Sequence, residues 1–423
     1  MSKAASLPIF YGWFIVVAAF LNLFFAVGII FYGFPVFYPA LVTGLGFTRA
    51  EVTQGFLLGF LIVGLPFGLI TGVMIDRIGA RAVILSGVGF IGLPLIGMGF
   101  MHHFWQYEVL CILEVIGYVL AGPISNQVLV ARWFRTRRGR AMGYAYLGLG
   151  LGGAVAPPTI NWLIRTIGWR CALQATGMAT LLVLLPVGLF ITRSTPGEMG
   201  LYPDGADVAT ITKQEIATAS ATIEIADALR DRNFWLILVG SALVIGAMNS
   251  VIQHFIFFLL SQGYTPGEAT RNLSILLVAS LGGRVIVGYI ADRYKKKNTM
   301  AGFYFLLGAA IPLLYLAHRP VVALGFAVIF GFSMGADYML IPLVTAECFG
   351  VASLGKVLAL IIMGYSIGQW VAPWVTGKIF DTLHTYNPVW KLMSAIAILG
   401  SLAIYSISTK RTPSDDGPRT MNL

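Results

Sequence analysis

Residues 72–81 read G-V-M-I-D-R-I-G-A-R, and the glycine, the aspartate and the arginine return 216 positions later in residues 288–293, G-Y-I-A-D-R. Two other pairs of stretches match at nearly the same shift, and one of them is a pair of T-x-x-E capping boxes, which open helices. These two pairs are residues 46–53 with 263–270, and residues 139–157 with 355–373. Three matches at nearly one shift predict that the chain consists of two equivalent halves.

The composition is that of a membrane protein. Hydrophobic residues make up 57% and charged residues 11% of the 423 positions, against about 45–50% and about 25% in soluble domains. Apolar runs of about 20 residues span a bilayer as helices, whereas barrel strands are runs of about 10 residues with alternating polarity. Twelve such helical runs are residues 10–40, 52–75, 82–101, 107–131, 141–164, 171–192, 234–261, 270–291, 299–317, 321–345, 357–380 and 391–409.

One long polar stretch separates the sixth run from the seventh, and its part at 212–231 can form a surface helix. We therefore expect an all-α membrane protein with twelve transmembrane helices in two pseudo-symmetric six-helix halves. The expected domains are an N-terminal bundle (1–192), a cytoplasmic linker (193–233) and a C-terminal bundle (234–423). Duplicated halves are found in secondary transporters, which rock around a site near the midplane of the membrane.

Basic residues indicate the topology. Lys and Arg concentrate on the side that holds both ends and the linker, for example in residues 132–140 and 293–297. The positive-inside rule makes this side cytoplasmic. We expect a multi-pass protein of the plasma (inner) membrane with both termini in the cytoplasm, and a functional monomer whose partners are the lipid bilayer and a small molecule.

Missing patterns exclude several classes of function. The three cysteines have no regular spacing, and neither H-E-x-x-H nor G-x-x-x-x-G-K-[ST] occurs. The sequence therefore predicts no metal site, no cofactor and no ATP-driven activity, and it offers no nucleophile–base pair for an enzyme. The residues that give the net charge of +10 lie between apolar runs and form no basic face that could bind nucleic acid. A sensor is disfavoured because the linker and the short tails leave no room for an output domain.

Two of these stretches resemble signatures of a known family. Residues 72–81 look like the loop signature between helices two and three of the major facilitator superfamily. Residues 133–148 resemble Y-F-x-K-R-R-x-L-A-x-G-x-A-x-A-G of its monocarboxylate transporter family, and they depart from it at Trp133, Thr136, Arg140 and Leu147. Residues 11–13 resemble the Gly/Trp opening of the family's first helix, without its acidic residue. Residues 196–205 resemble the linker of bacterial relatives that include oxalate/formate exchangers, which implies a prokaryotic protein.

Arg284 is the basic residue that lies deepest in an apolar run, about 12 Å before the end of its helix. Burying an arginine there costs about 2.5–3.5 kcal/mol, so such residues face a bundle interior or a cavity. Its planar fork of donors suits a carboxylate; the alternative is an internal ion pair. The resemblance implies the carboxylate, because monocarboxylate transporters bind it with an arginine of helix eight. The family's aspartate four residues earlier is Ser280 here, and its first-helix lysine is missing.

Proton coupling therefore needs another group. His254, with Asn249 near the same side of its helix, titrates near pH 6.5 without tuning, although a histidine bonded to helix backbone is the alternative. Asp337 and Glu114 lie inside their helices, and each is a candidate proton carrier or a partner of a basic residue. Because the ordinary pKa of aspartate is about 3.9, Asp337 would need desolvation to raise its pKa for proton transfer. We expect His254→Gln to flatten the dependence of uptake on external pH more than Asp337→Asn does.

Three further residues are candidates for substrate contact. Tyr118 and Tyr338 offer a phenol donor and an apolar wall for a short alkyl tail, with ordinary packing as the alternative. Lys378 lies near the outer end of its helix, where snorkelling to the interface is the simpler interpretation. It stays a candidate because oxalate/formate exchangers, which this chain resembles, have a lysine in helix eleven.

Charged residues end helices two and eight at the cytoplasm, namely Asp76, Arg77 and Arg81, and Asp292 and Arg293. The resemblance implies that such loops form charge networks that hold a cytoplasmic gate shut; orientation of the helices alone is the alternative. Since one arginine matches one carboxylate, the leading hypothesis is a proton-coupled symporter of a short monocarboxylate such as L-lactate or pyruvate, working by alternating access. The alternative is an anion exchanger of the oxalate/formate type, which would want a second deep cation.

Overall fold

The structure is a computed structural model, and it describes residues 10–47, 51–52, 54–55, 59, 63, 65–205 and 224–408. Within these residues the chain is helical and has no β-strand. Eleven of the described helical segments are long and apolar enough to cross a membrane. The all-α membrane fold predicted from the sequence is confirmed.

The described residues of the first half belong to six helical spans, of which the first changes its winding, the second is described mainly in its last part and the fourth is interrupted. The first passes from α1 (Gly12–Val27) through a π-helical segment (Gly28–Gly33) and a 3₁₀ turn (Phe34–Phe37) to α2 (Tyr38–Leu45). The other spans are α4 (Leu65–Ile78), α5 (Ala80–Met98), α6 with α7 (Phe104–Ala121 and Pro123–Trp133), α8 (Arg138–Ile167) and α9 (Trp169–Pro186), which a π-helical segment extends to Ile191.

The second half also contains six spans, of which the fourth is interrupted. A short helix, α11 (Ile225–Arg230), precedes them. The spans are α12 (Arg232–Ser261), α13 (Pro266–Arg293), α14 (Lys296–Ala310) with a 3₁₀ segment to Leu316, α15 with α16 (Pro320–Met334 and Asp337–Phe349), α17 (Leu354–Leu383) and α18 (Asn387–Tyr405).

The predicted runs agree with these helices to within a few residues, except where the chain lies outside the described residues. The second run (52–75) and the first capping box lie partly there, whereas the second box is present, with the backbone N–H of Glu268 3.3 Å from the Thr265 hydroxyl. The expected linker helix at 212–231 is described only from residue 224. The domain boundaries at 192 and 234 stay predictions.

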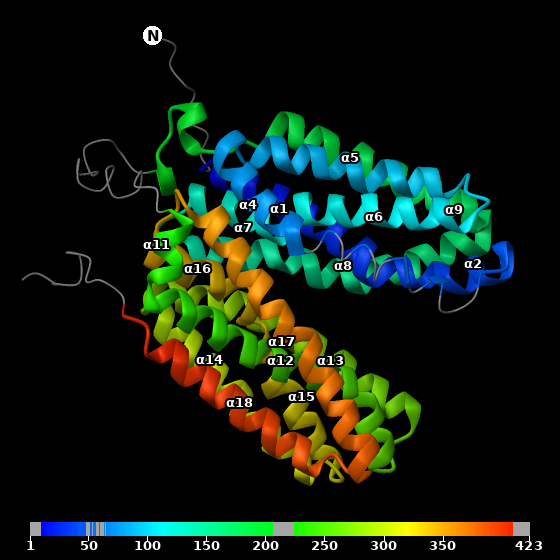
Figure 1. The fold of residues 1–423 in the computed structure, drawn as a ribbon, viewed down its shortest axis with the longest axis vertical. Helices are drawn as coiled ribbons and strands as arrows, with labels where there is room; N and C mark the ends of the chain where they lie inside the picture. The colour runs from blue at the N-terminus through cyan, green and yellow to red at the C-terminus, as the bar shows by residue number, and fades with distance from the viewer. Residues whose placement is uncertain are drawn as a thin grey trace, which may run out of the picture.

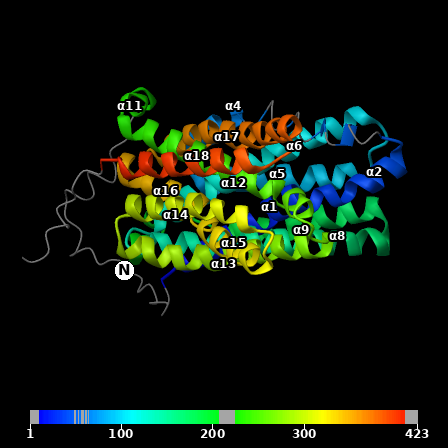
Figure 2. The ribbon, with the colours of Figure 1, turned by 90° about the horizontal axis from the view of Figure 1, so that it is seen from below.

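The two halves form a V in Figure 1. They converge at the end where α11 and the start of α1 lie, here called the linker side, and they diverge toward the opposite end. Contacts between the halves join α4 to α17, α8 to α13, and α16 to α7 and α8. In Figure 2, α4 and α17 lie along the upper edge and α8 and α13 along the lower edge.

Repeat-related glycines make both of the outer contacts. A Cβ added to Gly72 of α4 would lie 2.4 Å from the carbonyl oxygen of Gly355 in α17, and one added to Gly139 of α8 would lie 2.4 Å from that of Gly288 in α13. Gly72 and Gly288 are the glycines of the repeated G-x-x-x-D-R stretch, and Gly139 and Gly355 belong to another repeat. The helices therefore touch backbone to backbone, which only glycine permits.

Candidate substrate site and gate

The fourth helical span of each half is interrupted along its length. The break between α6 and α7 falls at Gly122, and the break between α15 and α16 falls at residues 335–336, close to the 216-residue shift of the repeat. The amide of Asn126 donates to the carbonyls of Ala121 and Gly122 at 2.7 and 2.8 Å and accepts from Asn22 at 3.0 Å. Side chains thus satisfy backbone groups that the break would leave unpaired in lipid.

Arg284 lies in α13, facing α8 of the other half. Its side chain is 7% exposed, and its Nη1 donates to the backbone oxygen of Tyr146 at 3.3 Å. A Cβ on Gly150 would lie 2.6 Å from this Nη1, so the glycine makes room for the guanidinium. Among the described residues Arg284 makes no ion pair within 4.0 Å. A buried cation without an anion partner is poised for one from outside.

Tyrosines surround this arginine. The hydroxyls of Tyr32, Tyr146 and Tyr338 lie close enough to interact electrostatically with its guanidinium. Tyr118 interacts in the same way with Tyr32, and the ring of Tyr365 lies 6.3 Å from that of Tyr338. These five phenols come from helices one, four, five, ten and eleven. The structure therefore brings the predicted Tyr118 and Tyr338 to the vicinity of Arg284; Tyr32, Tyr146 and Tyr365 were missed.

Two amides border the same group of phenols. The amide nitrogen of Gln127 in α7 donates to the backbone oxygen of Tyr338 at 3.0 Å and to the Tyr146 hydroxyl, and so it joins the two halves. Asn249 of α12 donates to the backbone of Ile245 at 3.0 Å, and its side chain also hydrogen-bonds Tyr338. The predicted Asn249 therefore lies at the site, whereas Gln127 was missed.

Asp337 begins α16, directly before Tyr338. It is fully buried, its Oδ1 accepts from the Tyr304 hydroxyl at 3.1 Å, and its Oδ2 has no partner among the described residues. The carboxyl interacts electrostatically with Arg284. The structure thus places this predicted acid within electrostatic range of the arginine.

Glu114 lies in α6, inside the first half. Its side chain is fully buried, and neither carboxyl oxygen has a partner among the described residues. Its electrostatic neighbours are Tyr38, Tyr107 and Cys111, whereas Arg284 is not among the groups with which it interacts. The structure does not bring this predicted acid to the arginine.

His254 and Lys378 lie toward the opposite end of the molecule. His254 is seven residues from the end of α12, with its ring nitrogens 3.3 Å from the Tyr386 hydroxyl and 3.2 Å from the backbone oxygen of Pro373. Lys378 is exposed near the end of α17. Arg284, by contrast, lies nine residues from the linker-side end of α13. The structure places His254 against backbone and Lys378 at the surface, as their alternative interpretations expected.

Asp76 joins the halves at the linker side. Its Oδ1 lies 3.1 Å from Arg132 of α7 in its own half, and its Oδ2 accepts from the backbone N–H of Lys356 at 3.2 Å. Lys356 is in the first turn of α17, so the carboxylate binds the positive end of a helix from the other half. The Gly72–Gly355 contact lies directly beside this bond.

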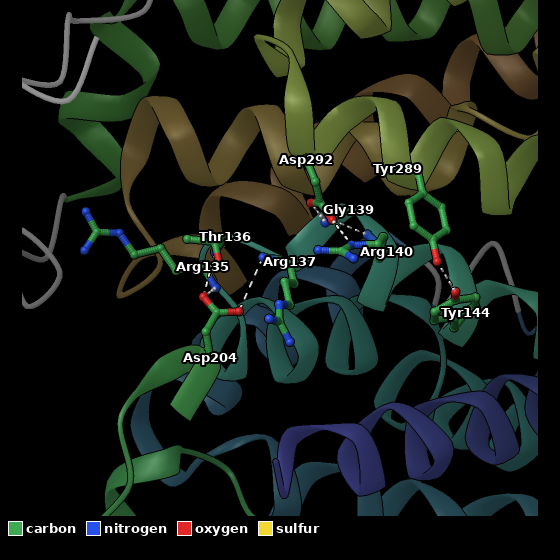
Figure 3. Close-up of polar contacts among 9 residues, drawn as sticks. All are labelled: Arg135, Thr136, Arg137, Gly139, Arg140, Tyr144, Asp204, Tyr289 and Asp292. Atoms are coloured by element: carbon green, nitrogen blue, oxygen red, sulfur yellow. Dashed lines mark hydrogen bonds and ion pairs between the residues drawn. The ribbon is translucent and has the colours of Figure 1, made fainter. Parts of the chain in front are cut away.

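Asp292 makes the equivalent contact with α8, as Figure 3 shows. It accepts from the backbone N–H groups of Gly139 and Arg140 at 2.6 and 3.1 Å, and from the Arg140 guanidinium at 3.0 Å. One turn further, the hydroxyls of Tyr144 and Tyr289 lie 2.8 Å apart. Each repeated aspartate therefore binds the N-terminus of a helix in the opposite half.

The other predicted gate residues do not join the halves. Arg81 donates to the backbone oxygens of Gly188 and Leu189 in its own half, at 3.2 and 2.6 Å. Arg77 and Arg293 are exposed and make no ion pair with a described residue.

The partners that the sequence analysis missed are Arg132 and Arg140. Arg140 follows Gly139 in a repeated stretch, at the position of Lys356, and this was the available signal.

Two repeat-related helical halves with a buried cation at their interface are typical of a secondary transporter. The model described as Major Facilitator Superfamily matches residues 19–373, and the chain belongs to this family, whose members are transporters and not enzymes. The chain is similar to MFS transporter asaE of Aspergillus flavus (23% identical, covering 79% of this chain and 72% of the relative). It is also similar to Monocarboxylate transporter 12 of Homo sapiens (26% identical, covering 70% and 61%). The fold matches a crystal structure of the E. coli fucose:proton symporter FucP with a TM-score of 0.71 and 14% identity, covering 93% and 98%.

Proposed function

We propose that this transporter carries a short monocarboxylate, such as L-lactate or pyruvate, together with one proton by alternating access. The observation that supports this proposal is Arg284, a 7%-exposed cation whose hydrogen bond goes to the backbone of Tyr146. A carboxylate can take both arms of its fork. The chain is also similar to a protein named a monocarboxylate transporter, although the match spans 61% of that protein's length.

The groups around Arg284 suit a small organic acid. The phenols of Tyr118, Tyr146 and Tyr338 supply hydroxyl donors for a carboxylate oxygen or a 2-oxo group, and ring faces for a methyl group. One arginine balances one negative charge. An exchanger of dicarboxylates would want a second buried cation, and Lys378 is exposed near the opposite end.

Asp337 is the proton site that the geometry favours. A proton on its unpartnered Oδ2 would remove the cost of a buried charge, and removal of that proton would create an anion that competes with the substrate for Arg284. His254 lies seven residues from the far end of its helix, so its titration would reach Arg284 only through intervening structure. Glu114, buried in the first half, has no described link to the arginine.

The same proposal fixes the orientation. The linker side carries most basic residues, so we place it in the cytoplasm with both termini, in the plasma membrane. The contacts of Asp76 and Asp292 close this side, and the conformation described here faces outward. We also propose that the protein functions as a monomer. The prokaryotic origin expected from the linker stays a prediction, since the two relatives named above are eukaryotic.

Uptake of labelled lactate into proteoliposomes tests the proposal. We expect saturable uptake that an inward proton gradient accelerates and that needs no anion inside. Uptake that occurs only into vesicles preloaded with a carboxylate would favour the exchanger. Absence of saturable flux for lactate, pyruvate and oxalate would contradict both functions.

A further inference from the structure

The linker contributes a carboxylate to the same helix N-terminus that the gate uses. Asp204 lies after the sixth span, and its Oδ2 accepts from the backbone N–H groups of Arg135 and Thr136 at 2.8 and 2.6 Å, while its Oδ1 accepts from that of Arg137 at 3.3 Å. These three residues directly precede α8, and beyond Arg138 the backbone donors of Gly139 and Arg140 bind Asp292 of the other half (Figure 3). Two carboxylates from distant parts of the chain thus divide one row of donors.

Asp204 lies in a tight turn of the linker. Its φ is 60°, in the left-handed region that aspartate and asparagine adopt more readily than other L-residues. Gly205 follows it, also with positive φ, and a Cβ on Gly205 would lie 3.0 Å from the ring of Phe10. Phe10 in turn packs on Phe134, with ring centroids 5.5 Å apart. The linker therefore also packs against the first half at the residue that follows the carboxylate.

The residue between the two sets of backbone donors is a buried arginine. Arg138 is 8% exposed, donates to the backbone of Phe134 at 2.8 Å, and interacts electrostatically with both Asp204 and Asp292. Its charge offsets the repulsion that two anions at one helix end would feel. The second half lacks this arrangement: the repeat places Leu354 at the position of Arg138.

We propose that Asp204 is a positioning residue of the gate. By binding the donors of residues 135–137 it fixes the start of α8, so that the donors of residues 139–140 are in place for Asp292 each time the linker side closes. Without it, closing would also have to order this turn, and the equilibrium would move toward the open linker side. This inference rests on the proposed alternating-access function.

Accessibility of a single cysteine tests the inference in the full-length protein. Cys111, Cys171 and Cys348 are replaced by serine or alanine, and Ala359→Cys supplies the reporter. Ala359 is 1% exposed at the contact of α4 with α17, away from α8, so its labelling by a membrane-impermeant maleimide reports opening of the whole side and not local fraying. Asp292→Ala in this background gives the rate for a weakened gate.

We expect Asp204→Ala to raise the labelling rate about two- to thirtyfold, the range for loss of a helix cap. Asp204→Asn, which keeps one acceptor and tolerates the left-handed conformation, should raise it less. Asp227→Ala, which removes an exposed linker carboxylate in α11, is the control and should leave the rate unchanged. Size-exclusion profiles check folding of each variant.

Three outcomes would overturn the inference. Asp204→Ala could label at the wild-type rate, or more slowly because repulsion between the carboxylates is relieved, while Asp292→Ala labels fast. Asp227→Ala could label as fast as Asp204→Ala, which would mean that any loss of linker charge suffices. If Asp292→Ala itself leaves the rate unchanged, the assignment of Asp292 to the gate is wrong, and so is the inference. Lactate uptake would still test the proposed function separately.

Discussion

Three arginines near the interface between the halves differ in their partners. Arg132 and Arg140 form ion pairs with Asp76 and Asp292 at 3.1 and 3.0 Å. Arg284 is more buried than either and has a carbonyl oxygen as its hydrogen-bond acceptor. A buried charge costs several kcal/mol unless it is paired, and a protein that keeps one unpaired has a use for it. A substrate carboxylate would supply the missing partner.

The pH dependence of uptake distinguishes the two proton candidates. Because Asp337 interacts electrostatically with Arg284 and His254 does not, we expect Asp337→Asn to flatten the pH profile of lactate uptake, while His254→Gln keeps the wild-type slope. Initial rates between pH 5 and 8 measure this. The sequence alone favoured the opposite result, and a flat profile in His254→Gln with a normal one in Asp337→Asn would restore that expectation.

Parts of the site could be predicted because single residues break a strong local pattern. Arg284 and Asp337 are charges in apolar runs, and Asp76 and Asp292 are repeated. Tyr32, Tyr146 and Tyr365 could not be predicted, because tyrosine is ordinary in a membrane helix and only the packing of five helices brings these rings together. The separation of His254 from Arg284 likewise depends on depth along two helices, which residue type does not reveal.

At the scale of elements, the glycine contacts between α4 and α17 set how closely the halves approach. We expect Gly72→Ala to open the linker side, because its Cβ would lie 2.4 Å from the Gly355 oxygen and overpacking costs about 1–3 kcal/mol. Gly68→Ala, one turn earlier in α4 with no atom within 4 Å of the new Cβ, is the control. The labelling rate of Ala291→Cys, at the other crossing, should rise in the first variant only; equal rates would contradict this explanation.

The break in helix four depends on Asn126. We expect Asn126→Ala to lower the free energy of unfolding by about 2–4 kcal/mol, because it removes three buried hydrogen bonds and leaves the Asn22 amide and the Ala121 carbonyl unpaired. Thermal unfolding in detergent measures the change. Thr159→Ala, which removes an exposed bond within α8, should stay within about 0.5 kcal/mol of wild type. A small effect of Asn126→Ala would mean that the break does not depend on it.

Element positions followed from the sequence more readily than element shape. The extent of an apolar run limits where a membrane helix can begin and end. The predicted runs therefore end within a few residues of the observed helices. The interruptions at Gly122 and at residues 335–336 were not predicted, because an apolar run continues through each of them. Side chains that satisfy the backbone at a break, such as Asn126, identify it only once the fold is known.

On the scale of the whole molecule, the linker side is closed by two contacts that are related by the repeat but unequal in strength. Asp292 makes three hydrogen bonds to α8, one of them an ion pair across the halves with Arg140. Asp76 bonds the backbone of Gly355 and Lys356 across the halves, whereas its ion pair with Arg132 stays within its own half. The repeat places Cys348 at the position of Arg132, which accounts for this difference.

This inequality predicts different effects of two matched variants. Asp292→Asn should raise linker-side labelling of Ala359→Cys more than Asp76→Asn does, by roughly tenfold if one charge-assisted bond of about 1.5 kcal/mol separates them. Both variants remove one charge from the same repeat, so a general effect of charge would act equally on them. Equal rates, or a larger effect of Asp76→Asn, would mean that these contacts do not set the strength of the gate.

The most direct measurement of the central claim is lactate uptake by Arg284→Lys in proteoliposomes with an inward proton gradient. The variant keeps the positive charge but loses the two-armed fork, so uptake should fall at least about tenfold, while size-exclusion and thermal unfolding stay near wild type. Arg170→Lys, whose arginine donates to the backbone of Gly99 and Met101 in an outer loop, should transport normally. Normal uptake by a folded Arg284→Lys would contradict the assignment of Arg284 as the carboxylate site.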